Sequence, residues 1–151
     1  MKITKIALAA MSLIGLSTLV ASAKNEPKTA YIFGFASSFN DSTVYITTVQ
    51  QLDSVYIQGK GKFLVSRENY SYQLRDYLEQ QGAGYRTCCV FFDTDQKKAE
   101  KRWMKLFNKY TAKPKSKKVK NGQQKDDAPT PYQLKQVSNG EFRFQSIAPS
   151  E

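Results

Sequence analysis

The basic side chains of this chain are concentrated in one segment. Residues 97–125 hold 12 lysine and arginine residues and one acidic residue, Glu100, whereas residues 24–96 and 126–151 together hold nine basic and 12 acidic residues. Such a segment could attract a polyanion or an anionic membrane surface. It could equally be a solvated helix face followed by a solubilising loop, and the composition leaves both interpretations open. The candidate binding residues are Lys98, Lys101, Arg102, Lys105, Lys109, Lys113, Lys115, Lys117, Lys118 and Lys120.

The type of cation indicates how this segment would bind. Lysine is far more frequent than arginine in it, and no aromatic residue is interleaved in residues 111–131. Lysine acts as a point charge rather than a bidentate reader, and a platform for single-stranded nucleic acid needs aromatic rings among its cations. We therefore expect diffuse, salt-sensitive binding without sequence-specific recognition of nucleic acid, and the partner stays open.

The composition excludes several classes of enzyme. The chain contains no histidine, which rules out Ser-His-Asp and Cys-His nucleophilic sites and removes the commonest metal ligand and general base. No glycine-rich phosphate loop is present, because Gly59-Lys60-Gly61 lacks the required pattern. Asp93 and Asp95 stand where a helix would begin, and helix capping explains them better than a bound cation. We therefore expect no metal and no cofactor.

The two cysteines, Cys88 and Cys89, are adjacent. They lack the spacing of a zinc site or a C-x-x-C redox motif. Neighbouring residues of a strand point to opposite faces, so we expect one thiol in the core and the other on the opposite face. A redox role or an intermolecular disulfide is the alternative.

The elements that would position these residues follow from hydrophobic periodicity. Apolar residues recur on one helical face in residues 66–81 and again in 95–110, and each run has a candidate cap, Ser66 and Thr94. Gly82 would end the first helix. The expected strands are 31–39, 43–49, an ambiguous short one at 55–57, a central strand at 86–92, and a hairpin of 132–137 and 141–147 around Asn139-Gly140.

This order predicts a single α+β domain over residues 30–147. It runs strand, strand, helix, strand, helix, long loop, strand, strand, with the helices packed on one face of a mixed or antiparallel sheet. Residues 24–29 are expected to be a flexible lead-in, and the Lys/Pro-rich residues 111–131 a mobile loop.

Two resemblances add to this interpretation. The first similarity is carried by the order of strands and helices, by Tyr31-Ile32 and Tyr45-Ile46-Thr47, and by a helix arginine and Glu100. With these features, about residues 30–110 resemble the GIY-YIG nuclease domain. The resemblance implies a metal-dependent nuclease whose site residues would be Tyr31, Tyr45, Arg67 or Arg75, and Glu100. The chain also resembles short, signal-bearing proteins of Gram-negative bacteria without an assigned function, through the stretches 31–36 and 67–75, which implies export and a compact domain.

Residues 1–23 have the pattern of a secretory signal peptide. Lys2 and Lys5 precede a short apolar core, and Ala21-Ser22-Ala23 has the form of a cleavage site. We expect export, to the periplasm or outside, after cleavage following Ala23. The sequence therefore favours an exported, non-catalytic interaction or accessory domain of the cell envelope or exterior with one cationic patch. The alternative is a GIY-YIG-like metal-dependent nuclease or another protein that acts on polyanions.

Overall fold

The computed structural model describes residues 26–112 and 131–149. The described residues form six strands and two helices, which are β1 (Pro27–Ser37), β2 (Thr43–Thr47), β3 (Gln50–Gln58), β4 (Phe63–Leu64), α1 (Arg67–Gln80), β5 (Thr87–Asp93), α2 (Gln96–Thr111) and β6 (Gln133–Val137). The expected signal peptide (1–23) and most of the expected loop (113–130) lie outside the described residues.

Strand β1 is the centre of the sheet, and it is antiparallel to three other strands. Along one edge of β1, strand β3 pairs with the first half, where Ile32 lies opposite Gln50. Strand β2 pairs with the second half of the same edge, where Phe35 lies opposite Ile46. Strand β5 pairs with the other edge. Strand β6 extends the sheet in parallel beside β2, and the short β4 pairs with β3. The α+β class, the mixed sheet and the single domain are thus confirmed.

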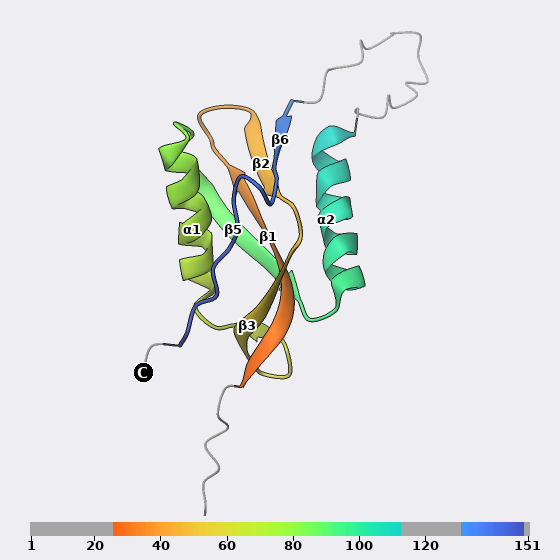
Figure 1. Ribbon diagram of the computed structural model, residues 1–151. Helices are drawn as coiled ribbons and strands as arrows, with labels where there is room; N and C mark the ends of the chain where they lie inside the picture. The colour runs from red at the N-terminus through yellow and green to blue at the C-terminus, as the bar shows by residue number, and fades with distance from the viewer. Residues whose placement is uncertain (1–25, 113–130, 150–151) are drawn as a thin grey trace, which may run out of the picture.

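The two helices cover opposite faces of the sheet, whereas the sequence led us to expect both on one face. Ile32 and Ala36 of β1 belong to a core cluster with α1, whereas Phe33 and Phe35 belong to a second cluster with α2. Alternate residues of a strand point to opposite faces. Figure 1 shows α1 and α2 on either side of β1. Both faces of β1 are therefore buried, which explains its nearly unbroken run of apolar residues.

Strand β5 is an edge strand, not the central strand that its apolar sequence predicts. Among the described residues it pairs with β1 alone. Val90 packs in the α1 cluster and Phe91 in the α2 cluster, so both faces of β5 are covered. Its dense apolar run therefore reports two covered faces rather than two neighbouring strands.

The chain after β6 crosses the α1 face instead of returning as the expected hairpin. The turn at Asn139-Gly140 forms, but residues 142–149 are not a strand. The buried Gln50 side chain accepts a hydrogen bond from the Phe144 N–H and donates one to the Phe142 carbonyl. Phe142 and Phe144 pack in the α1 cluster. Burial of the Phe144 ring and partial burial of the Phe142 ring stabilise this crossing.

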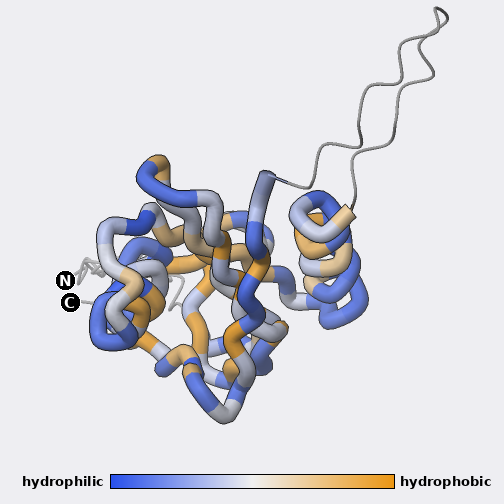
Figure 2. Tube along the Cα trace, turned by 90° about the horizontal axis from the view of Figure 1, so that it is seen from above, coloured by the Kyte–Doolittle hydropathy of each residue, from blue (hydrophilic) through white to orange (hydrophobic). Residues whose placement is uncertain are grey.

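The buried face of α1 and the residue at which this helix ends are those predicted from the sequence. Tyr70, Leu74 and Leu78 of α1 are fully buried, and Gly82 follows the helix with a φ of 76°. The Gly82 and Ala83 N–H groups bond to the Glu79 and Leu78 carbonyls, which is a Schellman motif. In Figure 2, the hydrophilic residues of α2 lie on the side away from the rest of the protein.

The starts of α2 and β1 differ from the expected ones, whereas α1 begins after Ser66 as expected. Asp95 rather than Thr94 caps α2, by accepting the Lys98 N–H. Ser66 precedes α1 but makes no side-chain capping bond. Strand β1 begins at Pro27, so residues 27–29 of the expected lead-in are part of a strand, because β3 is long enough to pair with them.

Candidate functional site

The site that the described residues favour lies along the free edge of β5. The carbonyl groups of Val90 and Phe92 point away from β1, and each accepts a hydrogen bond from an arginine. Arg67, the first residue of α1, donates Nε and Nη2 to the Val90 oxygen at 3.1 and 2.5 Å. Arg102 of α2 donates Nη1 to the Phe92 oxygen at 3.4 Å. Two guanidinium groups from opposite sides of the sheet are thereby held on one edge.

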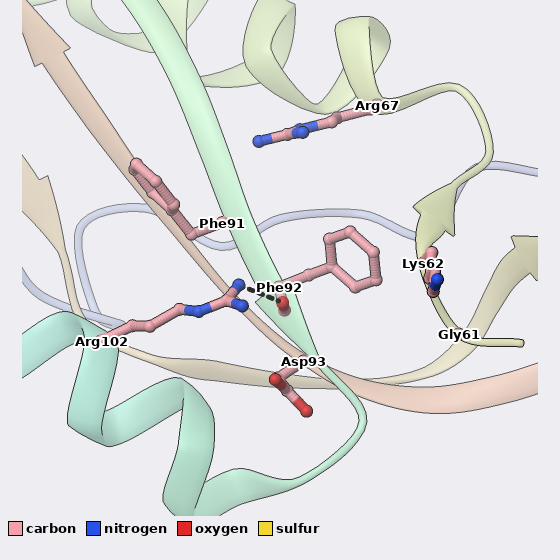
Figure 3. A pocket seen from close by; sticks show the side chains of 7 residues that line it. All are labelled: Gly61, Lys62, Arg67, Phe91, Phe92, Asp93 and Arg102. Carbon is pink, nitrogen blue, oxygen red and sulfur yellow. Dashed lines mark hydrogen bonds between the residues drawn. The ribbon is translucent and has the colours of Figure 1, made fainter.

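Two adjoining cavities follow this edge, with volumes of about 280 and 500 Å³. They share Arg67, Phe91 and Arg102, so together they form one groove. We call it the edge groove, and its lining includes Lys62, Arg67, Phe91, Arg102, Lys105 and Lys109. Figure 3 shows the ring of Phe91 on one side of β5 and the side chain of Arg67 on the other, with Arg102 reaching the strand at the Phe92 carbonyl.

The edge groove is strongly cationic. Five of its lining side chains are basic, and Asp93 is the one acidic lining residue within residues 26–112 and 131–149. The β3–β4 turn contributes Lys62, α1 contributes Arg67, and α2 contributes the other three. A concave site lined by one sign of charge concentrates the electrostatic potential and raises the local concentration of counter-ions. The groove can therefore hold an anion.

Helix α2 carries six cations, of which three line the edge groove. Lys98, Arg102, Lys105 and Lys109 recur at spacings of four, three and four residues, which places them on one flank. The last three line the edge groove, whereas Lys97 and Lys101 do not.

The rotation of α2 is fixed by its apolar side. Ala99 is buried, and Trp103 donates Nε1–H to the Thr47 carbonyl at 2.7 Å. Because this side must face the sheet, the flank with Arg102, Lys105 and Lys109 faces the β5 edge.

An aromatic floor lies beneath the cations. Phe91 is half-buried and stacks on the fully buried Phe33, with ring centroids 5.1 Å apart and an interplanar angle of 18°. Leu106 of α2 adds apolar surface beside them. Residues 111–131 contain no aromatic residue among their lysines, but the fold places Phe91 among the cations of the groove.

The two cysteines lie on opposite faces, as expected. Cys88 packs with the α1 cluster and Cys89 with the α2 cluster, and both are half-buried free thiols. Burial raises the pKa of Cys88 to about 11, and it also raises the pKa of Cys89. Both thiols are therefore protonated near neutral pH, which does not favour a nucleophilic role.

The residues implied by the nuclease resemblance are not brought together. Tyr45 belongs to the α1 side of the sheet, whereas Tyr31 shares the strand face of Phe33 on the α2 side. Arg75 is bound to Asp76 on the exposed side of α1, and Glu100 bonds to Gln96 on the surface of α2. Of the five, Arg67 alone lines the groove.

The described residues show no cluster for a metal ion. In residues 26–112 and 131–149, no three cysteine, aspartate or glutamate side chains are grouped as ligands. Asp93 accepts the Asp95 N–H and Asp95 caps α2, so both act at the helix start as expected. Among the expected polyanion-binding residues, Lys113, Lys115, Lys117, Lys118 and Lys120 lie outside the described residues.

Sequence reasoning missed the contribution of the groove residues that lie outside α2. Lys62 and Arg67 are 35 or more positions before Arg102 in the chain, so no local pattern links them to it. The sequence offers one signal for Phe91. Side chains alternate between the two faces of a strand, so Phe91 lies on the opposite face of β5 from the neighbouring Val90.

No protein-family model, curated protein or solved structure matches this chain. No described helix has the length and apolar character needed to cross a membrane. The chemistry of the site is therefore inferred from its own residues.

Proposed function

We propose that the protein is an exported accessory domain that binds an anionic polymer through the edge groove. The observation that carries the proposal is the convergence of Lys62, Arg67, Arg102, Lys105 and Lys109, from three separate elements, on one concave surface. A merely solubilising surface has no need to gather cations in a groove. Asp93 is the one carboxylate that lines the groove in the described residues, and it accepts the Asp95 N–H at the start of α2. The other titratable lining groups are cations, so binding rather than catalysis is the proposed activity.

The attraction between the groove cations and an anionic polymer acts over a limited distance, and the binding affinity depends on salt concentration. Exposed charges act over about 8 Å at physiological ionic strength. Arg102 and Lys109 are seven residues apart on α2, a distance of about 10 Å along the helix axis. Their row can therefore contact more than one anionic group of a polymer. Each contact releases counter-ions, so the affinity should fall steeply as salt is added.

The proposal is tested by comparing cations of α2 that line the groove with cations of the same helix that do not. The double variant Lys105→Gln/Lys109→Gln removes two groove cations, and Lys97→Gln/Lys101→Gln removes two cations of the same helix outside the groove. Heparin affinity would be measured over a range of salt concentrations. The first variant should flatten the salt dependence by about one in slope for each lost contact, and the second should change it far less. Equal effects would mean that α2 binds through its total charge and not through the groove.

A second comparison separates the groove from the lysine-rich segment. Deletion of residues 113–125 should leave most of the heparin affinity in place if the groove is the binding site. If the deletion abolishes binding and the groove variant does not, the proposed site is wrong. Anionic vesicles in the same assay decide between a soluble polymer and a membrane surface, because preferential vesicle binding would contradict a polymer ligand.

Export is the second part of the proposal, and it rests on the signal-peptide pattern of residues 1–23. N-terminal sequencing of the protein recovered from the periplasm or medium should begin at Lys24. Recovery from the cytosol alone, with Met1 retained, would contradict export.

A further inference from the structure

We infer that the edge groove holds a nucleotide unit, with the planar base stacked on Phe91 and the phosphate bound by Arg67 and Arg102. The anionic polymer would then be a single-stranded nucleic acid. The inference rests on the proposed function and adds the chemistry of the ligand. It is carried by the placement of one aromatic ring and two guanidinium groups in one groove, where both guanidinium groups bond to the edge of β5 (Figure 3).

The ring of Phe91 is a supported platform. One of its faces stacks on the buried Phe33, which holds the ring in place from below. Phe91 is itself half-buried and lines both cavities, so part of the ring is open to the groove. A purely polyanionic ligand, such as a sulfated sugar chain, gains little from this surface. Stacking of a base on an aromatic ring is tolerant of sequence and contributes about tenfold or more to affinity.

The arginines are arranged to receive a phosphate. A guanidinium group carries five N–H donors. Arg67 uses two of them on the Val90 carbonyl, and Arg102 uses one on the Phe92 carbonyl. Two bonds hold Arg67 on the strand edge, Arg102 has one longer bond of 3.4 Å, and each guanidinium group has further N–H donors with which to bind a phosphate. The planar fork of arginine suits phosphate, which is bound more weakly by a flexible lysine.

The same hydrogen bonds disfavour an acidic peptide as the ligand. An extended peptide that adds to a sheet edge pairs with the free backbone carbonyl groups of the edge strand. On β5 the carbonyls of Val90 and Phe92 are occupied by Arg67 and Arg102. Lys105 and Lys109 continue the cationic row beyond the ring, where the next phosphate of a strand would lie.

Little discrimination among bases is expected. Asp93 is the one acidic side chain lining the groove in the described residues, and the other polar lining groups are cations suited to phosphate. Stacking and phosphate contacts do not read the base edge. This agrees with the expectation from the sequence that nucleic acid is not recognised sequence-specifically.

The test uses an oligothymidylate of about ten nucleotides, within the usual range for a single-strand site, and an abasic oligomer of the same length. Fluorescence anisotropy would give both affinities for the purified full-length mature protein. The oligothymidylate should bind about tenfold more tightly than its abasic counterpart. Equal affinities would overturn the inference, because the bases would then contribute nothing.

Phe91→Leu keeps apolar packing against Phe33 but removes the aromatic face, and Tyr72→Leu is the control at an exposed aromatic residue of α1 outside the groove. Phe91→Leu should lower oligothymidylate affinity about tenfold and leave heparin affinity unchanged, while Tyr72→Leu changes neither. Circular dichroism would verify that each variant is folded. A loss of affinity for both ligands in folded Phe91→Leu would contradict a base platform.

The outcomes separate this inference from the proposed function. If heparin binding depends on Lys105 and Lys109 but Phe91→Leu has no effect on either ligand, the groove is a charge site and the nucleotide is wrong. If neither ligand binds the unaltered protein, both proposals fail. Competition by thymidine monophosphate at concentrations close to those of the oligomer would support the nucleotide unit and identify a free nucleotide, not a strand, as its source.

Discussion

Arg67 and Val90 are joined across the free edge of β5 by two hydrogen bonds to one carbonyl oxygen. The Nε and Nη2 groups of Arg67 lie 3.1 and 2.5 Å from that oxygen. This contact links the first residue of α1 to the strand that precedes α2. It also covers an unpaired carbonyl of an edge strand, a position at which another chain could otherwise pair. The same side chain thus protects the sheet edge and forms one wall of the edge groove.

The first prediction concerns Arg67. Arg67→Lys keeps the positive charge but loses the fork that reaches the Val90 carbonyl. We expect a loss of about 1–2 kcal/mol in the free energy of unfolding, because a hydrogen bond from a charged group to a partly buried acceptor is lost. Urea unfolding followed by circular dichroism measures it. Arg143→Lys, at an exposed position outside the groove, is the control, and an equal effect there would contradict a special role for Arg67.

The second prediction concerns the close packing of β1 against α1. A Cβ atom at Gly34 would lie 2.6 Å from Cδ2 of the buried Leu74, and 3.1 Å from Cζ of Phe144. Gly34→Ala should therefore destabilise the protein by about 1–3 kcal/mol through overpacking. At Gly84 the nearest atom would be 3.5 Å away, in the flexible Glu79 side chain, so Gly84→Ala is the control.

The coupling between Gly34 and Leu74 provides the check on this explanation. In the double variant Gly34→Ala/Leu74→Ala the clash is removed, so the cost should be less than the sum of the two single costs. Additive costs would mean that the clash is not what destabilises Gly34→Ala.

The third prediction concerns Trp103, which fixes the rotation of α2. Trp103 is half-buried, so Trp103→Ala should lower the free energy of unfolding by less than the roughly 3–5 kcal/mol expected for a fully buried ring, but clearly more than a surface substitution does. Trp103→Phe keeps a ring to stack on Phe107 but leaves the Thr47 carbonyl without its donor, at a cost of about 1–3 kcal/mol. Lys105→Ala should stay within about 0.5 kcal/mol, because its side chain is exposed. Equal losses in all three variants would contradict this placement of the helix.

The fourth prediction concerns the pH dependence of Cys88. Burial raises the pKa of its thiol from 9.0 to about 11, so the native state holds this proton where the unfolded state releases it. The resulting stabilisation is complete below pH 9 and is lost as the pH rises toward 11. Alkylation of Cys88 by iodoacetamide at pH 8 should be slow in native protein and fast in urea. A comparable rate in both states would mean that the thiol is exposed and ionised normally.

The elements that the sequence predicts well are those with a local signal. The helix faces of Tyr70, Leu74 and Trp103 follow from spacing alone, and Gly82 ends α1 because a glycine is favoured at its φ of 76°. The antiparallel pairing of β1 with β2 likewise follows from the turn residues Asn40-Asp41-Ser42 between them. In each case residues close together in the chain determine the structure.

The parts that the sequence did not predict depend on contacts between distant residues. The apolar run of β5 has the same pattern whether two strands or two helices cover it, so its edge position was missed. Phe142 and Phe144 alternate as a strand would, but their partners are Gln50 and the α1 cluster. The groove could not be predicted for the same reason. Arg67 and Arg102 lie on one surface only because β5 packs between their helices.

Amide chemical-shift mapping during titration with oligothymidylate tests the central claim most directly, because it locates the ligand without altering a residue. With ¹⁵N-labelled protein, the largest changes should occur at Lys62, Arg67, Phe91 and Phe92, and along residues 102–109 of α2. The residues after β6 that cross the α1 face should change little. Changes confined to residues 113–125, or spread evenly over all exposed lysines, would contradict the edge groove as the binding site.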